Sequence, residues 1–361
     1  MMKPRIKAII VAVLIFSITL LNLIKADNEL SIWERRKLKQ FPEFKVEALF
    51  SGKWFMDFED YALDQIVFRH EFRKLKIWFE ETVLGKQDIS GLFSEESHIF
   101  KIIDYKSIAE LERFVAYVQN LKEDYFNDNK IYYVHIPDKT LYSGREQLIQ
   151  IESETEAFLK ENLQGLSFVS ISNKLSLQNF YSTDTHWRQE TLHPIVKEIL
   201  EGIGVQVQCD EKDFIIKTHP SFLGVLYGQL PSHREDEALI YLDHPNFQTY
   251  SIYDYEKGFI EMYDESKLSG LDAYDVYLSG ASPILEITNP HAKTDKELIV
   301  FRDSFGSSIL PLLSFNYAKI IAVDTRYVTS SHLADTIDFS KDQDVLFLYS
   351  SGIVHNFETL R

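Results

Sequence analysis

The fold is decided by the segment Leu298-Ile299-Val300-Phe301-Arg302-Asp303-Ser304-Phe305-Gly306. Its four leading apolar residues predict a buried strand, and the small residues Gly306, Ser307 and Ser308 indicate that a helix begins directly after Asp-Ser. In open α/β sheets, ligands bind just beyond the carboxyl ends of the strands. We therefore expect Ser304 to lie at the ligand-binding edge of such a sheet.

The same alternation of strand and helix extends over most of the chain after residue 100. Strands are predicted at 131–136, 168–171, 298–301, 319–323 and 345–349, and helices at 108–121, 152–163, 194–203 and 307–315. This order favours an α/β fold with a parallel sheet covered by helices on both faces. Residues 205–290 are less regular, and we predict them to be an irregular insertion. Within it, Arg234-Glu235-Asp236-Glu237 is expected to be a solvated turn.

Composition narrows the class of protein. The chain has 361 residues, of which 45% are hydrophobic and 26% charged, as is typical of a globular protein. Its formal charge of −17 argues against nucleic acid as a partner, because phosphate backbones are bound by clusters of Lys and Arg. The single cysteine, Cys209, excludes an internal disulfide, and we expect it to be structural.

The N-terminus predicts a membrane segment. Lys3, Arg5 and Lys7 precede the uncharged stretch 8–24, a pattern typical of a signal peptide or an uncleaved signal anchor. Ala26 suits position −1 of a cleavage site but Ile24 is poor at −3, so we favour the anchor, with a cleaved signal as the alternative. Residues 1–7 are then a cytoplasmic tail, 8–24 a single transmembrane helix, and the remainder extracellular.

Residues 25–90 are predicted to form a stalk and membrane-proximal helices, and residues 91–361 the main domain. In the stalk region, apolar residues recur three and four positions apart, which indicates one face of a helix. These residues are Phe68, Phe72, Leu75, Phe79 and Val83. We expect this helical region to pack on the main domain near the membrane.

Two segments carry candidate chemistry. A helix that begins behind Ser304 offers free backbone N–H groups, including those of Ser304 and Gly306, which stabilise an oxyanion. In the segment Thr183-Asp184-Thr185-His186-Trp187, His186 could take the serine proton and Asp184 could fix the histidine tautomer. The alternatives are that Ser304 or Asp184 only caps the following helix.

Together these segments resemble the DHHW proteins of Gram-positive bacteria, which are related to the AlgX/AlgJ-type alginate O-acetyltransferases. The stretch 36–42, with Asp57-Phe58-Glu59-Asp60-Tyr61 and Asp324-Thr325-Arg326-Tyr327, is similar to that family as well. The resemblance implies an SGNH-hydrolase-like, flavodoxin-like fold with a permuted motif order. It implies a triad in which Ser304 is the nucleophile, His186 the base and Asp184 its orienting carboxylate.

The resemblance leaves the remaining site residues less defined. Arg326 and Tyr327 are candidates for oxyanion or substrate contacts, and Trp187 is expected to wedge its loop or line a sugar site. The oxyanion-hole Gly and Asn of SGNH enzymes have no certain counterpart here. Residues 279–282 and Asn356 are possible sources, and Gly306 and the Ser304 N–H are favoured.

The resemblance implies an extracellular O-acetyltransferase that modifies a cell-surface or secreted polysaccharide through an acetyl-serine intermediate. Its implied partner is a membrane-bound O-acyltransferase that supplies acetyl groups across the membrane. An acetylesterase with the same triad and an inactive carbohydrate-binding scaffold remain alternatives. No cofactor is predicted, and the acidic residues show no spacing typical of a metal site.

Overall fold

The computed structural model describes residues 3–126, 129–231 and 237–361, and the chain divides into two compact units. The N-terminal unit comprises residues 1–89 with 227–234, and the sheet unit comprises 90–226 with 235–361. The N-terminal unit contains the following elements: α1 (Pro4–Ile24), β1 (Leu30–Ser31), β2 (Arg36–Lys37), α2 (Val46–Phe50), α3 (Lys53–Gln65), α4 (Arg69–Trp78) and a π-helical turn, η1 (Phe79–Val83). Helix α8 (Val225–Gln229) runs from the sheet unit into the N-terminal unit.

Helix α1 coincides with the apolar N-terminal stretch. It begins at Pro4, a residue favoured in the first turn because it has no N–H to leave unpaired. Its 21 residues are long and apolar enough to cross a bilayer, although a signal sequence has the same properties. The predicted apolar face of α4 also forms, but Phe68, Phe72, Leu75, Phe79 and Val83 are all exposed.

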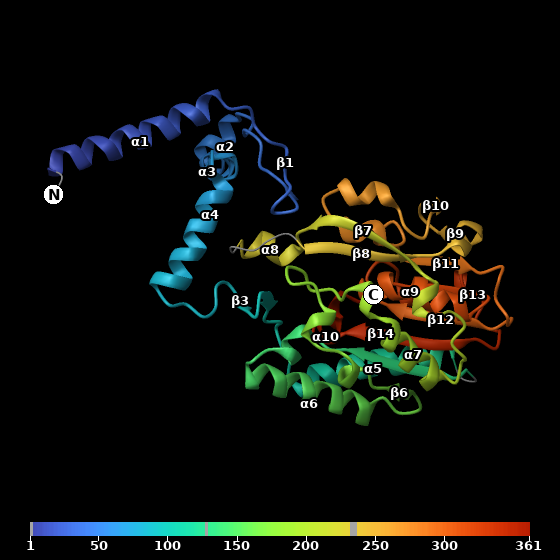
Figure 1. Ribbon diagram of the computed structural model, residues 1–361. Coiled ribbons are helices and arrows are strands. Elements are labelled where there is room, and N and C mark those ends of the chain that lie inside the picture. The colour runs from blue at the N-terminus through green and yellow to red at the C-terminus, as the bar shows by residue number, and fades with distance from the viewer. Residues whose placement is uncertain (1–2, 127–128, 232–236) are drawn as a thin grey trace. The chain divides into compact units, whose positions relative to one another are not determined.

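The central sheet has eight strands in the order β10-β9-β11-β13-β12-β14-β5-β6 (Figure 1). Five neighbouring strands pair in parallel: β5 (Ile131–Ile136), β6 (Ser167–Val169), β12 (Glu297–Arg302), β13 (Lys319–Val323) and β14 (Asp344–Ser350). All five were predicted, because each contains a short apolar run, and all but β6 at the sheet edge are largely buried on both faces. The mainly parallel α/β sheet expected from the sequence is therefore confirmed.

Helices cover both faces of this sheet. Alternate strand residues point to opposite sides, so Val300 packs in the core with α7 (His193–Ile203) and α9 (Phe305–Leu313). Its neighbour Phe301 packs in the second core with α5 (Ile108–Tyr125) and α6 (Glu146–Asn162). The capping box of Ser107 and Glu110 fixes the start of α5.

The interpretation of residues 205–290 as an insertion was wrong for three of the five strands described there. Strands β9 (Ser251–Asp254), β10 (Gly258–Phe259) and β11 (Ile284–Thr288) extend the central sheet, with β11 antiparallel to β13. Strand β11 lies between β9 and β13 and has apolar residues buried on both of its faces. Strands β7 (Ile215–Phe222) and β8 (Glu237–Asp243) instead form a separate antiparallel pair, as do β3 (Leu92–Glu95) and β4 (His98–Lys101). Cys209 is buried and in no disulfide.

Candidate active site

The carboxyl ends of four parallel strands converge on one cavity of about 460 Å³. Asp138 follows β5, Ser304 follows β12, Arg326 follows β13, and Ser350 ends β14, and all four line this cavity. This is the edge at which open α/β sheets bind ligands. Ser304 therefore lies where the sequence places it, at the start of α9 and at the ligand-binding edge of the sheet.

Three side chains form a continuous hydrogen-bonded relay at this edge. His186 Nε2 lies 2.8 Å from Ser304 Oγ, although the two residues are 118 positions apart in the chain. The other ring nitrogen, Nδ1, lies 2.6 Å from Asp184 Oδ1. The Asp184 side chain is 1% exposed and that of His186 is 14% exposed. This geometry allows a carboxylate to orient an imidazole that accepts a proton from a hydroxyl.

Asp184 is held in place from several directions. Its Oδ1 also accepts the His186 backbone N–H at 3.1 Å, and its Oδ2 accepts the Val225 N–H at 2.8 Å. The buried Lys139 ammonium donates to the Asp184 carbonyl at 2.7 Å. Gly224 packs so closely that a Cβ there would lie 2.3 Å from Asp184 Cβ. Only glycine permits this approach, which fixes the carboxylate against the imidazole.

Glu237 organises the start of the same loop and was missed by the sequence interpretation. Its carboxylate accepts hydrogen bonds from the backbone N–H and the hydroxyl of both Ser182 and Thr183, at 2.8 to 2.9 Å. The prediction that Glu237 lies in a solvated turn was wrong, because it begins β8 and satisfies four donors. Residues 234–236 of that predicted turn lie outside the described residues.

Aromatic rings fix the plane of the His186 imidazole. The Tyr274 ring stacks on it with centroids 4.0 Å apart and planes 15° apart, and Phe305 lies against it at 5.0 Å. The Tyr274 hydroxyl donates to Ser308 Oγ at 2.8 Å, which ties the stacking ring to α9. Tyr274 lies in the irregular region 205–290, where no periodic pattern points to it.

Trp187 does not line a sugar site, because its side chain is fully buried. Its indole N–H is shared between the Phe305 carbonyl at 3.1 Å and Ser308 Oγ at 2.8 Å. The residue after the histidine is thus bonded to the first turn of the helix after the serine. Trp187 is therefore the wedge that joins the two segments of the relay, which was the alternative considered from the sequence.

We expect Trp187→Phe to keep the buried ring but lose both hydrogen bonds, so the free energy of unfolding should fall by about 1–3 kcal/mol. Denaturant unfolding of purified protein measures this change. Trp78→Phe is the matched control, because Trp78 is exposed and should change the midpoint little. Equal stability of the two variants would contradict the role assigned to the indole N–H.

Gly306 is not the oxyanion donor that the sequence favoured. Its N–H donates to the Asp303 carbonyl at 3.1 Å, as expected for a tight first helical turn. Glycine is required there because a Cβ would lie 2.8 Å from the Arg302 side chain, which passes beneath the helix. The Ser304 N–H has no hydrogen-bond acceptor among the described residues, so it is the remaining backbone candidate. Asn356 lines the cavity, as the sequence allowed.

Arg326 and Tyr327 differ in their relation to the cavity. Arg326 lines it, and its guanidinium donates to both oxygens of the buried Asp324 carboxylate, at 2.8 and 2.6 Å. This bidentate pair holds a cation at the cavity wall. Tyr327 is 48% exposed and does not line the cavity in the part of the chain that the structure describes. Of these two candidates for oxyanion or substrate contacts, only Arg326 therefore lines the cavity among the described residues.

Beneath the cavity, a buried carboxyl is shared among several polar groups. Glu152 Oε2 accepts from Ser351 Oγ at 2.5 Å and from the Asp138 N–H at 3.2 Å, and Oε1 accepts from the Tyr105 hydroxyl at 2.9 Å. Burial, with the nearby Asp138 carboxylate, raises the pKa of Glu152 from 4.5 to about 8. His135, which is also buried, completes the cluster through Ser351 at 3.0 Å.

The raised pKa of Glu152 predicts an alkaline loss of stability. The folded chain binds this proton more tightly than the unfolded chain, so the free energy of unfolding falls as pH rises from about 4.5 through about 8. We expect Glu152→Gln, which cannot ionise, to be more stable than the parent at pH 9 by about 1–3 kcal/mol. Denaturant unfolding at pH 6 and pH 9 tests this. The exposed Glu161→Gln is the control, and an unchanged pH profile in Glu152→Gln would refute the assignment.

Comparisons with known proteins gave structural matches only. No family model and no curated protein sequence matches the chain. A crystal structure of a DHHW family protein from Eubacterium siraeum aligns with a TM-score of 0.59 and 18% identity, over 75% of this chain and 95% of that one. The chain has the fold of that DHHW family structure. This agrees with the resemblance found in the two sequence motifs.

Two structures of PatB1 from Bacillus cereus give a similar result. Each has a TM-score of 0.58 over 73% of this chain and 97% of PatB1, with 16% identity for the form with a sulfonyl adduct and 17% for the other. The O-acetyltransferase domain of Pseudomonas putida AlgJ aligns with a TM-score of 0.43 and 10% identity. The chain therefore shares an α/β fold with a mainly parallel sheet with the DHHW family structure and PatB1.

Proposed function

We propose that this chain is an O-acetyltransferase that acts outside the cell membrane on a surface or secreted polysaccharide. The observation that carries the proposal is the relay from Asp184 through His186 to Ser304, opening on a cavity at the strand ends. A hydroxyl next to an oriented imidazole and a helix N-terminus is suited to acyl transfer. The resemblance of the two motifs to the DHHW family, with whose crystal structure the chain shares its fold, supports the same proposal.

In the first half-reaction, Ser304 Oγ attacks the carbonyl carbon of an acetyl ester while His186 Nε2 takes the hydroxyl proton. The Asp184 carboxylate stabilises the imidazolium that forms. The Ser304 N–H would donate to the oxyanion, and the dipole of α9 would stabilise its charge. Collapse of the tetrahedral intermediate transfers the proton to the leaving alcohol and leaves acetyl-Ser304.

In the second half-reaction, His186 takes the proton of a sugar hydroxyl as its oxygen attacks acetyl-Ser304. The acetyl group then moves to the sugar, and the proton returns to Ser304. Water in place of the sugar would release acetate, so the same residues could perform hydrolysis. An acetyl donor outside the membrane has to be supplied from inside, and we propose a membrane-bound O-acyltransferase as that partner. Helix α1 is proposed to anchor the chain beside it.

The experiment that tests this function compares two fates of the acetyl group. Purified full-length chain is given a chromogenic acetate ester, with and without neutral and acidic oligosaccharides as acceptors. If the chain transfers the acetyl group, mass spectrometry should detect acetylated oligosaccharide. If the chain is an esterase, the only product should be free acetate. A folded chain that neither cleaves the ester nor reacts with a sulfonyl fluoride would instead be a binding scaffold. Sulfonyl reagents are suitable probes because PatB1 is described with a sulfonyl adduct.

A further inference from the structure

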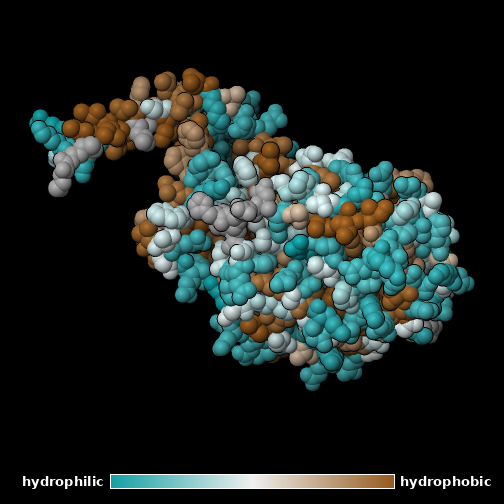
Figure 2. Space-filling view, viewed as in Figure 1, coloured by the Kyte–Doolittle hydropathy of each residue, from teal (hydrophilic) through white to brown (hydrophobic). Residues whose placement is uncertain are grey.

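The N-terminal unit exposes far more apolar surface than the sheet unit. Among described residues, eighteen large apolar side chains are exposed between residues 26 and 89, whereas nine are exposed between residues 90 and 361. Soluble proteins rarely gather exposed apolar residues so densely without a partner that covers them. Figure 2 shows such side chains along α1 and again over the helices that follow it.

Helix α4 with η1 gathers most of its exposed apolar side chains on one side, although Trp78 and Leu84 beside them are exposed as well. Phe68, Phe72, Leu75, Phe79 and Val83 are 40 to 58% exposed and recur three and four positions apart, so they form one stripe, which we call the α4 stripe. Phe68 also adopts a left-handed backbone conformation with φ of 59°, which is costly for an aromatic residue. Nothing within the described N-terminal unit buries these side chains in return.

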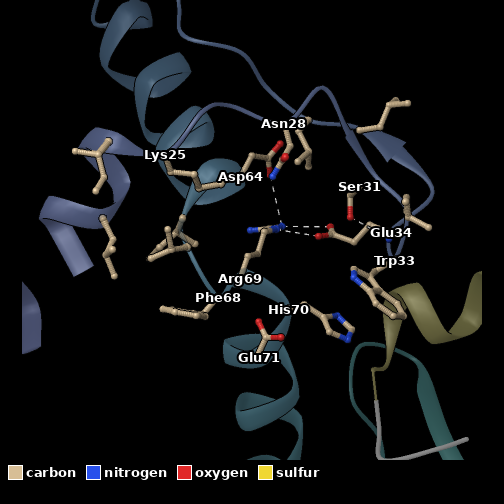
Figure 3. Close-up of a pocket in the computed structure, with 17 residues that line it drawn as sticks. Lys25, Asn28, Ser31, Trp33, Glu34, Asp64, Phe68, Arg69, His70 and Glu71 are labelled. Carbon is tan, nitrogen blue, oxygen red and sulfur yellow. Dashed lines mark hydrogen bonds and ion pairs between the residues drawn. The ribbon is translucent and has the colours of Figure 1, made fainter. Parts of the chain in front are cut away.

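The opposite side of α4 is fully engaged. Arg69 pairs with Glu34 at 2.8 Å, and the His70 ring stacks on Trp33 with centroids 4.4 Å apart. Arg73 donates to the Gly228 carbonyl at 2.6 Å. Figure 3 shows Arg69 and His70 turned toward Glu34 and Trp33, while Phe68 extends in another direction. These contacts fix the rotation of the helix, so the α4 stripe is held outward.

The end of α1 is joined to the start of α4. Asn22 Oδ1 accepts the Val67 N–H at 2.8 Å, and Lys25 Nζ donates to the Gln65 carbonyl at 3.0 Å. Leu21 and Ile24 line the same cavity of about 740 Å³ as Phe68 and Arg69. If α1 crosses a bilayer, α4 therefore begins close to the membrane surface.

Charge favours lipid as the partner of this surface. Residues 1–89 carry 15 Lys and Arg against 13 Asp and Glu, whereas residues 90–361 carry 23 against 42. The strongly acidic remainder is repelled by anionic lipid, and the N-terminal unit is not. Helix α4 itself combines an aromatic stripe with Lys74 and Lys76 beside it, the composition of helices that lie in a membrane interface.

We propose that α4 with η1 is an interfacial helix, whose α4 stripe inserts into the outer leaflet of the bilayer that α1 crosses. The partner that covers the α4 stripe is lipid, not a second protein. The helix would hold the N-terminal unit flat on the membrane, rather than leaving it on a free tether. This inference rests on the membrane anchor and does not involve the triad.

The test uses the full-length chain with Cys209→Ser, and with Ser304→Ala so that activity has no influence. Single cysteines at Phe72→Cys and Leu75→Cys carry nitroxide labels, and the protein is reconstituted in phosphatidylethanolamine–phosphatidylglycerol vesicles. Phe259→Cys is the matched control, because Phe259 is a highly exposed apolar residue of the sheet unit. Collision rates with oxygen and with a neutral nickel chelate report lipid and water exposure.

Insertion predicts that labels at 72 and 75 collide with oxygen in preference to nickel, with an oxygen-to-nickel ratio several-fold above that at 259. Nickel accessibility equal to that at 259 would place the α4 stripe in water and overturn the proposal. Labels shielded from both reagents would show that the stripe packs against protein, which overturns it equally. A cysteine at Phe79 repeats the measurement one turn further along if either first variant is poorly folded.

Discussion

Ser304→Ala will lower the rate of ester cleavage by at least about 10³-fold and will abolish covalent labelling by a sulfonyl fluoride. The variant lacks the only hydroxyl that lies within hydrogen-bond distance of His186 Nε2 in the described structure, at 2.8 Å. The cavity, the helix N-terminus and the His–Asp pair all remain, so binding and folding should be retained. Burst kinetics with a chromogenic acetate and intact-protein mass spectrometry measure the two effects.

Ser307→Ala is the control that makes this result specific. Ser307 lies one turn further along α9 and contacts Arg302, not the imidazole, so that variant should still take one sulfonyl group. Full labelling of Ser304→Ala, or its loss in Ser307→Ala with Ser304 intact, would show that Ser304 is not the nucleophile. Circular dichroism of both variants separates these outcomes from unfolding.

The parts of the fold that the sequence predicts are those whose signal is local. Each of the five parallel strands is a short apolar run, and the strand at 297–302 leads directly into the serine and its helix. The His and Asp of the relay are two residues apart, so their contact is also local. The order of the motifs and their resemblance to the DHHW family then indicated which distant segment they meet.

The parts that sequence could not predict depend on contacts between irregular segments. Glu237 looked like one charge in an acidic turn, yet it anchors Ser182 and Thr183. Tyr274 stacks on the imidazole from a region without periodicity. Strand β11 was overlooked because the addition of an antiparallel strand to a parallel sheet is set by the chain path and not by composition. Burial of Trp187 likewise depends on α9 lying opposite its loop.

Asp184→Asn is expected to lower the rate of ester cleavage by about 10³- to 10⁴-fold while leaving Ser304 and His186 in place. The carboxylate accepts from donors on both sides: the His186 N–H and Nδ1 meet Oδ1, and the Val225 N–H meets Oδ2. An amide has only one acceptor oxygen, so in either orientation its NH₂ group faces a donor.

The two orientations of the amide fail for different reasons. With its oxygen toward Val225, the NH₂ group donates to His186 Nδ1, which moves the imidazole proton to Nε2 and removes the acceptor for Ser304. With its oxygen toward His186, the tautomer is correct, but the Val225 N–H is unpaired and the imidazolium loses its counter-charge. Both orientations leave the nucleophile poorly activated.

The measurement is the pH–rate profile of ester cleavage for Asp184→Asn, beside Asp210→Asn as an exposed-carboxylate control. The loss should be greatest near neutral pH and should shrink as pH rises, because hydroxide then replaces the imidazole as the base. If Asp184→Asn cleaves the ester at the wild-type rate, Asp184 only holds its loop in place and does not contribute to catalysis. A uniform loss at every pH, together with a lowered unfolding midpoint, would assign the effect to the broken Val225 contact and not to the tautomer.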